Sequence, residues 1–143
     1  MKINQVLAKL KSLGNAENAA GMARFGININ QAFGVRMPDI RKLGKEVGVD
    51  HSLALALWDT GIHEARILAS TVDDPQQVTV EQMDSWIVDF NSWDLCDQVC
   101  GNLFDKTPYA YAKAVEWTGR EAEYEKRAGF AMMAWLAVHD KKA

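Results

Sequence analysis

The chain has 143 residues, 48% of them hydrophobic and 24% charged, which is the composition of one globular domain and excludes a disordered segment. Its net charge of −3 argues mildly against a protein that binds nucleic acid over its whole surface. The charge is unevenly distributed: residues 1–50 carry +4, residues 51–100 carry −8 and residues 101–143 carry +1. A local basic patch that binds nucleic acid is therefore still possible.

The first half of the chain is predicted to form five helices with recognisable start or stop signals. Residues 26–37 interrupt the helical periodicity and are predicted to form an ordered loop. The predicted helices cover residues 3–13, residues 15–24 with a stop at Gly26, residues 38–47 with a stop at Gly48, the stretch from the cap Asp50 to the break at Gly61, and residues 62–72.

The second half begins with a turn at residues 73–75 and is also predicted to be helical throughout. Thr79 opens a capping box for a helix that reaches Phe90, and Asn91 or Ser92 caps the next one, which starts at Trp93. A loop at 105–107 precedes a helix from Pro108, with Thr107 as its cap, and a last helix covers about residues 120–138. No segment alternates as a strand does, so we predict an all-α fold of about nine helices.

The helix from Trp93 combines apolar and acidic residues in an unusual way. Trp93, Cys96, Cys100 and Leu103 recur at helical spacing and predict one apolar face. Asp97 follows Trp93 by four residues, so the carboxylate and the indole share a face. A carboxylate that borders an apolar stripe must be paired, partly hydrated or used in function.

The other chemistry-bearing residues give weaker signals. The two cysteines lie on adjacent turns, which is poor disulfide geometry, so we expect two buried thiols in a reducing cytoplasm. No signal peptide is evident, and the longest nearly apolar run, residues 128–138, falls short of the ~20 residues of a membrane span. No metal spacing links His51, His63 and His139, and no metal or cofactor is expected. The four remaining tryptophans are interpreted as core residues rather than substrate platforms: Trp58, Trp86, Trp117 and Trp135.

A repeat of about 30 residues relates three charged positions. Arg66, Asp97 and Arg127 occupy equivalent positions in the second helix of successive helix pairs, 31 and 30 residues apart. Such a period predicts a helical solenoid whose second helices line a concave surface, with these three side chains in a row. The arginines would then bind phosphates and Asp97 would face the nucleotide between them, but a structural salt-bridge ladder between stacked helices explains the pattern equally well.

A second basic cluster lies in the segment GVRMPDIRKLGK. Its cations are either a solvated helix face or contacts to DNA phosphates near the point where DNA enters the groove. The cluster comprises Arg36, Arg41, Lys42 and Lys45. Glu64 precedes Arg66 by two residues and cannot pair with it along the helix.

Four segments together resemble the DNA alkylation repair, AlkD-like family of HEAT-like repeat proteins. They are residues 34–48, 56–70, 84–108 and 126–141, and the resemblance covers about residues 20–143. It implies an α-α superhelix with a concave basic groove. It also implies a DNA glycosylase that releases cationic N3- and N7-alkylated purines from duplex DNA and leaves the damaged base in the stack. By resemblance Asp97 is the catalytic aspartate, Trp93 its aromatic partner and Arg127 the family's conserved arginine.

The expectation is therefore one HEAT-like repeat domain over residues 1–143 that lacks the family's last C-terminal repeat. Its expected activity is hydrolase chemistry in base-excision repair of alkylated DNA. A fixed carboxylate suits this reaction because positive charge develops on the sugar as the base leaves. The alternative is a non-catalytic helical-repeat module that binds DNA or a protein through the same groove. The oligomeric state stays open.

Overall fold

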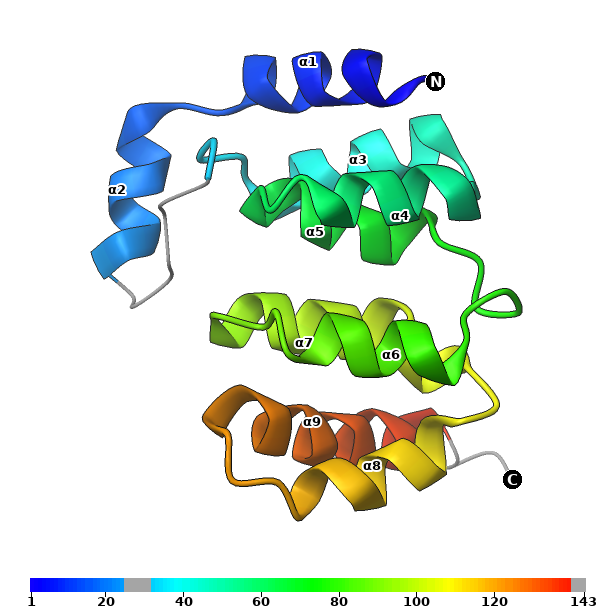
Figure 1. The fold of residues 1–143 in the computed structure, drawn as a ribbon. Helices are drawn as coiled ribbons and strands as arrows, with labels where there is room; N and C mark the ends of the chain where they lie inside the picture. The colour runs from blue at the N-terminus through cyan, green and yellow to red at the C-terminus, as the bar shows by residue number, and fades with distance from the viewer. Residues whose placement is uncertain (25–31, 140–143) are drawn as a thin grey trace. The chain divides into compact units, whose positions relative to one another are not determined.

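The computed structural model describes residues 1–24 and 32–139 and is helical, as the sequence predicts (Figure 1). Within these residues there are nine α-helices, one short 3-10 helix and no strand. The helices are α1 (Ile3–Leu13), α2 (Ala16–Arg24), α3 (Met37–Val47), α4 (His51–Asp59), α5 (His63–Val72), α6 (Val80–Ile87), α7 (Trp93–Asn102), η1 (Phe104–Lys106), α8 (Ala110–Thr118) and α9 (Glu123–His139).

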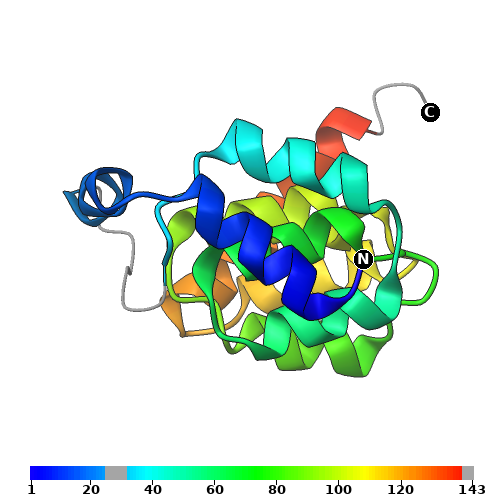
Figure 2. The ribbon, with the colours of Figure 1, turned by 90° about the horizontal axis from the view of Figure 1, so that it is seen from above.

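The described chain divides into two compact units, Met1–Asp74 and Pro75–Ala143. In the first unit α5 packs against α4 and α3, and α1 contacts all three helices. Viewed from above, α1 crosses over this group while α2 lies to one side of it (Figure 2). The prediction of a single domain over residues 1–143 stays a prediction.

The segment that leads into α3 is held by a buried carboxylate. Glu64, in the first turn of α5, is fully buried. Its Oε1 accepts a hydrogen bond from the backbone N–H of Phe33 at 2.9 Å. Its Oε2 accepts from the N–H groups of Gly34 at 2.8 Å and Val35 at 2.9 Å. The carboxylate therefore satisfies three backbone donors that no helix or sheet would satisfy, and it fixes the approach to α3.

Gly34 allows the same segment to lie against the start of α2. Its φ of +77° belongs to the left-handed region that side chains disfavour. A Cβ atom at this position would lie 2.1 Å from the carbonyl oxygen of Asn15. Only glycine permits both this backbone conformation and this close approach.

In the second unit α9 packs against α8 and α7 and also contacts α6. Phe104 of η1 lies at the centre of an aromatic cluster, with ring centroids 5.7 Å from Trp117, 6.2 Å from Trp86 and 6.3 Å from Phe90. Gly129 allows close packing of α9 on α8, because a Cβ atom there would lie 2.4 Å from the backbone nitrogen of Thr118. This core supports the surface formed by α7 and α9.

Three of the helices start at the capping residues that the sequence predicts. The side chains of Asp50, Thr79 and Ser92 accept hydrogen bonds from the backbone N–H groups of their helices, which confirms these caps. Thr107 differs, because its hydroxyl donates to the carbonyl of Phe104 at 2.8 Å within the 3-10 turn. As a result α8 begins at Ala110, two residues later than predicted. The predicted stop at Gly26 lies outside the described residues.

Burial confirms most of the predicted core. Trp58, Trp86 and Trp117 are buried, and the two cysteines are free and buried. Trp135 differs, because 40% of its surface is exposed. None of the helices within residues 1–24 and 32–139 combines the length and apolar character that a membrane crossing requires.

Candidate functional site

The site is organised around an ion pair between α7 and α9. Arg127 donates from Nε to Oδ1 of Asp97 at 3.0 Å and from Nη2 to Oδ2 at 2.8 Å, so the contact is bidentate. The hydrogen bonds to Asp97 raise the pKa of Arg127. The side chains are 46% exposed for Arg127 and 32% exposed for Asp97, so solvent and ligand can reach both. Each carboxylate oxygen keeps a free acceptor direction, because an oxygen of this kind accepts about two hydrogen bonds.

The start of α7 places Trp93 one turn before Asp97 on the exposed side of the helix. Ser92 caps the helix and donates its hydroxyl proton to Oδ1 of Asp94 at 2.6 Å. The same oxygen accepts from the N–H of Leu95 at 2.8 Å, which fixes the first turn. Trp93 is 43% exposed and so does not belong to the buried stripe that the sequence predicts. It instead shares with Asp97 the face that points to solvent.

The buried side of α7 explains why this face is outward. Cys96 and Cys100 point toward α9, where their thiols donate to the carbonyls of Tyr124 at 3.5 Å and Ala128 at 3.7 Å. Burial is the main cause that raises the pKa of Cys100, so this thiol stays protonated. The two cysteines thus act as small packing residues, and the turn between them carries Asp97 at the surface.

A hollow of about 380 Å³ adjoins the ion pair on α9. Two small residues, Ala131 and Ala134, and two large aromatic side chains, Phe130 and Trp135, also line it. Phe130 is 56% exposed and Trp135 is 40% exposed. The hollow therefore combines a carboxylate, a guanidinium and two accessible aromatic rings, which are groups that suit a nucleotide.

The ion pair also fits the structural alternative, since it joins two helices, α7 and α9, that belong to neighbouring predicted repeats. An exposed pair of this kind contributes only about 0–1 kcal/mol to stability. Asp97 is thus tied to a neighbouring helix without being buried by it. A stabilising role alone does not explain why the pair borders an open hollow.

Arg66, the third member of the predicted row, contacts Trp58 within its own unit. Nε of Arg66 donates to the carbonyl of Trp58 at 3.1 Å, and the guanidinium lies 5.0 Å from the centroid of the Trp58 ring. This stacking orients the side chain. Its predicted role in phosphate binding stays a prediction.

The basic residues of α3 fall into two different environments. Arg41 and Lys45 are exposed and line a hollow of about 390 Å³ beside Gly44, Gly48 and Thr71, and the charged residues that line it are both basic. Arg36, at the N-terminal boundary of α3, is also exposed. The positive charge of Arg41 and Lys45 is therefore not offset by an acid in the lining of their hollow.

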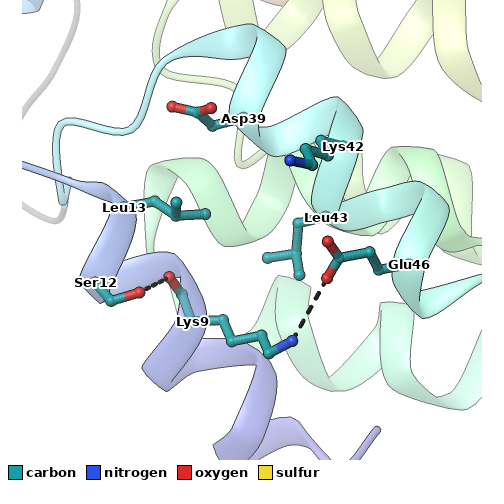
Figure 3. A pocket seen from close by; sticks show the side chains of 7 residues that line it. All are labelled: Lys9, Ser12, Leu13, Asp39, Lys42, Leu43 and Glu46. Atoms are coloured by element: carbon teal, nitrogen blue, oxygen red, sulfur yellow. Dashed lines mark hydrogen bonds and ion pairs between the residues drawn. The ribbon is translucent and has the colours of Figure 1, made fainter.

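Lys42 faces another pocket, of about 280 Å³, between α1 and α3 (Figure 3). Asp39 and Glu46 line the same pocket, and Glu46 pairs with Lys9 of α1 at 3.4 Å. These carboxylates reduce the attraction of the pocket for phosphate. Lys42 is therefore the least favourable phosphate contact among the predicted residues of α3.

The sequence prediction missed Phe130 and assigned Trp135 to the core. Apolar residues occur on every face of α9, so periodicity does not reveal which face is exposed. A usable signal was the spacing, because Phe130 and Ala134 follow Arg127 by three and seven residues and so share its face.

The paired helices and the α7–α9 surface define a protein of the HEAT-like repeat class. A solved structure described as "a new family of proteins related to the HEAT-like repeat DNA glycosylases with affinity for branched DNA structures" matches with a TM-score of 0.86 at 24% identity. The match covers 95% of this chain and 57% of that chain, so the sequence spans little more than half of the solved relative. No curated protein sequence matches the chain. The model of the DNA alkylation repair enzyme family matches residues 6–143, and the chain belongs to that family.

Proposed function

We propose that the protein is a DNA glycosylase that releases cationic N3- and N7-alkylpurines, with Asp97 as the catalytic carboxylate. The observation that carries this proposal is the placement of Asp97. It is an accessible acid, fixed by a bidentate guanidinium and bordered by an open hollow. Membership of the DNA alkylation repair enzyme family supports the choice of substrate.

The chemistry requires little more than a fixed negative charge. An alkylated purine already carries a positive charge, so the C1′–N bond breaks with its electron pair and the base leaves as a neutral molecule. Positive charge then develops on the sugar, and the carboxylate of Asp97 stabilises it. Water adds to C1′, and its proton passes to the carboxylate or to solvent. The exposed indole of Trp93 adds a cation–π attraction of about 0.5–2 kcal/mol.

Arg127 has two roles in this proposal. Its bidentate contact holds the carboxylate in one orientation, which lowers the cost of organising the site during the reaction. Its remaining N–H groups, on a side chain that is 46% exposed, are available to a phosphate. Arg36, Arg41 and Lys45 supply further exposed positive charge for the DNA backbone.

The test is release of 7-methylguanine from duplex DNA by the protein and by Asp97→Asn. The variant should remain folded, because an exposed ion pair contributes at most about 1 kcal/mol, and should retain DNA binding. We expect base release to fall by about 100-fold or more, as for removal of other electrostatic catalytic groups. Equal release by both proteins would refute the role of Asp97.

A second candidate function is DNA binding without base release. The observation that favours it is that each oxygen of Asp97 already accepts a hydrogen bond from Arg127, which partly neutralises the carboxylate. The solved relative, a member of a family described by its affinity for branched DNA, is consistent with such a role. Salt-dependent DNA binding by a protein that releases no base from any alkylated duplex would establish this second function.

A further inference from the structure

We propose that Phe130 and Trp135 form an aromatic shelf that stacks an unpaired nucleobase, so that the preferred DNA carries an unpaired base at a branch point, bulge or strand end. The inference rests on the proposed function for the position of DNA at α7 and α9. It adds a substrate class and two binding residues to that site. Both residues line the hollow that contains Asp97 and Arg127.

The first argument is exposure of large aromatic surface beside a positive charge. Phe130 is 56% exposed and Trp135 is 40% exposed, whereas the tryptophans at three other helical positions are almost fully buried. Accessible aromatic faces beside a guanidinium are the usual means by which proteins bind unpaired bases, since every base has a π face. The ion pair places Arg127 where it can contact the phosphate of the same nucleotide.

The second argument is that the Trp135 ring is held in place from behind. A Cβ atom at Gly101 of α7 would lie 2.6 Å from Cε2 and 2.7 Å from Nε1 of Trp135. The indole therefore packs directly on the α7 backbone, one turn after Asp97, in space that any other residue would fill. A ring that is fixed before binding loses little conformational entropy when a base stacks on it.

The third argument is the shape of the hollow. Besides the shelf and the ion pair, the described residues that line the hollow have only small side chains, Ala131 and Ala134, so little side-chain volume obstructs a flat group. The volume of about 380 Å³ lies within the range of ~300–1,000 Å³ for small-molecule sites. The base that enters is already unpaired, so the site does not require extraction of a base from the duplex.

The experiment compares binding of unmodified DNA by fluorescence anisotropy at one fixed salt concentration. The ligands are a continuous duplex and the same duplex with a single-nucleotide bulge that carries 2-aminopurine. We expect the protein to prefer the bulged duplex by about tenfold, which corresponds to the stacking of one base. Stacking on the shelf should also quench the 2-aminopurine fluorescence.

The decisive variant is Phe130→Leu, which keeps an apolar side chain but removes the π face. Its matched control is Tyr111→Leu on α8, another aromatic residue, 58% exposed, that does not line the hollow. Phe130→Leu should abolish both the preference for the bulged duplex and the quenching of 2-aminopurine fluorescence. Tyr111→Leu should retain both. Loss in both variants, or in neither, would overturn the proposal.

A second variant tests the support of the shelf. Gly101→Ala should displace the indole and reduce the preference for the bulge without changing affinity for the continuous duplex. An unchanged preference in Gly101→Ala would contradict the positioning argument.

Failure of the proposed function is separate, because it appears as absent base release from alkylated continuous duplex by the unmodified protein. Failure of the shelf appears as equal affinity for bulged and continuous DNA.

Discussion

Replacement of Glu64 should destabilise the protein more than replacement of any exposed carboxylate on its helices. The side chain is fully buried and accepts three backbone hydrogen bonds at 2.8–2.9 Å. A hydrogen bond to a charged acceptor contributes about 1.5–3 kcal/mol, so the three bonds have an upper limit of about 4.5–9 kcal/mol. Two effects lower this figure: the desolvation cost of the carboxylate is also removed, and the segment at 33–35 can detach and hydrate its N–H groups.

We therefore expect Glu64→Ala to lower the free energy of unfolding by about 3–4 kcal/mol. Glu64→Gln should cost about 2 kcal/mol, because its carbonyl oxygen still accepts from two N–H groups while its amide group faces the third. Glu46→Gln is the matched control, since Glu46 is about half exposed and forms one ion pair at 3.4 Å. That change should cost less than about 0.5 kcal/mol.

Urea denaturation followed by circular dichroism measures these differences, and amide hydrogen exchange locates them. In the Glu64 variants the amides of Gly34 and Val35 should lose protection while those in α9 keep theirs at conditions that favour the folded state. A Glu64→Ala variant within about 0.5 kcal/mol of the unmodified protein would refute the reasoning. So would a variant in which these two amides remain protected.

Three further predictions concern helix packing, the pH dependence of stability and the salt dependence of DNA binding. Gly129→Ala should cost about 1–3 kcal/mol in thermal or urea unfolding, because its Cβ atom meets α8 backbone at 2.4 Å. Gly21→Ala, in open space on α2, should instead stabilise by up to about 1 kcal/mol, and the same sign for both would contradict the packing argument. Burial lowers the pKa of Lys113, but hydrogen bonds to two carboxylates raise it more, so its net pKa lies above 10.5. The ammonium of Lys113 should therefore stabilise the fold fully below about pH 10.5, and this stabilisation should be lost as the pH rises through the folded-state pKa. Lys113→Met should cost about 1 kcal/mol of unfolding free energy at pH 7 and less in strong alkali. A cost that does not change with pH would contradict this assignment. Arg41→Gln and Lys45→Gln should each reduce the slope of log Kd against log salt for duplex DNA by about 1, and unchanged slopes would place the DNA elsewhere.

Sequence reasoning predicted Asp97 and Arg127 of the candidate site through a repeat, but it did not predict the aromatic residues that line the adjoining hollow. The 30-residue spacing predicted that Asp97 and Arg127 occupy equivalent positions on the second helices of successive pairs, and the two side chains form a bidentate contact between α7 and α9. Their interpretation as either a groove feature or a structural rung stayed open, because spacing does not report solvent exposure. Phe130 and Trp135 were missed because α9 is apolar on all sides.

What the sequence determined by itself is local: the helical character of the chain and the caps at Asp50, Thr79 and Ser92. These features depend on interactions within one helical turn, so nearby residues suffice to specify them. The tertiary structure alone decided which apolar side chains remain exposed and where the carboxylate of Glu64 finds its donors, 29–31 residues away in the sequence. Such contacts depend on which helices cover each face, and no short-range pattern encodes that arrangement.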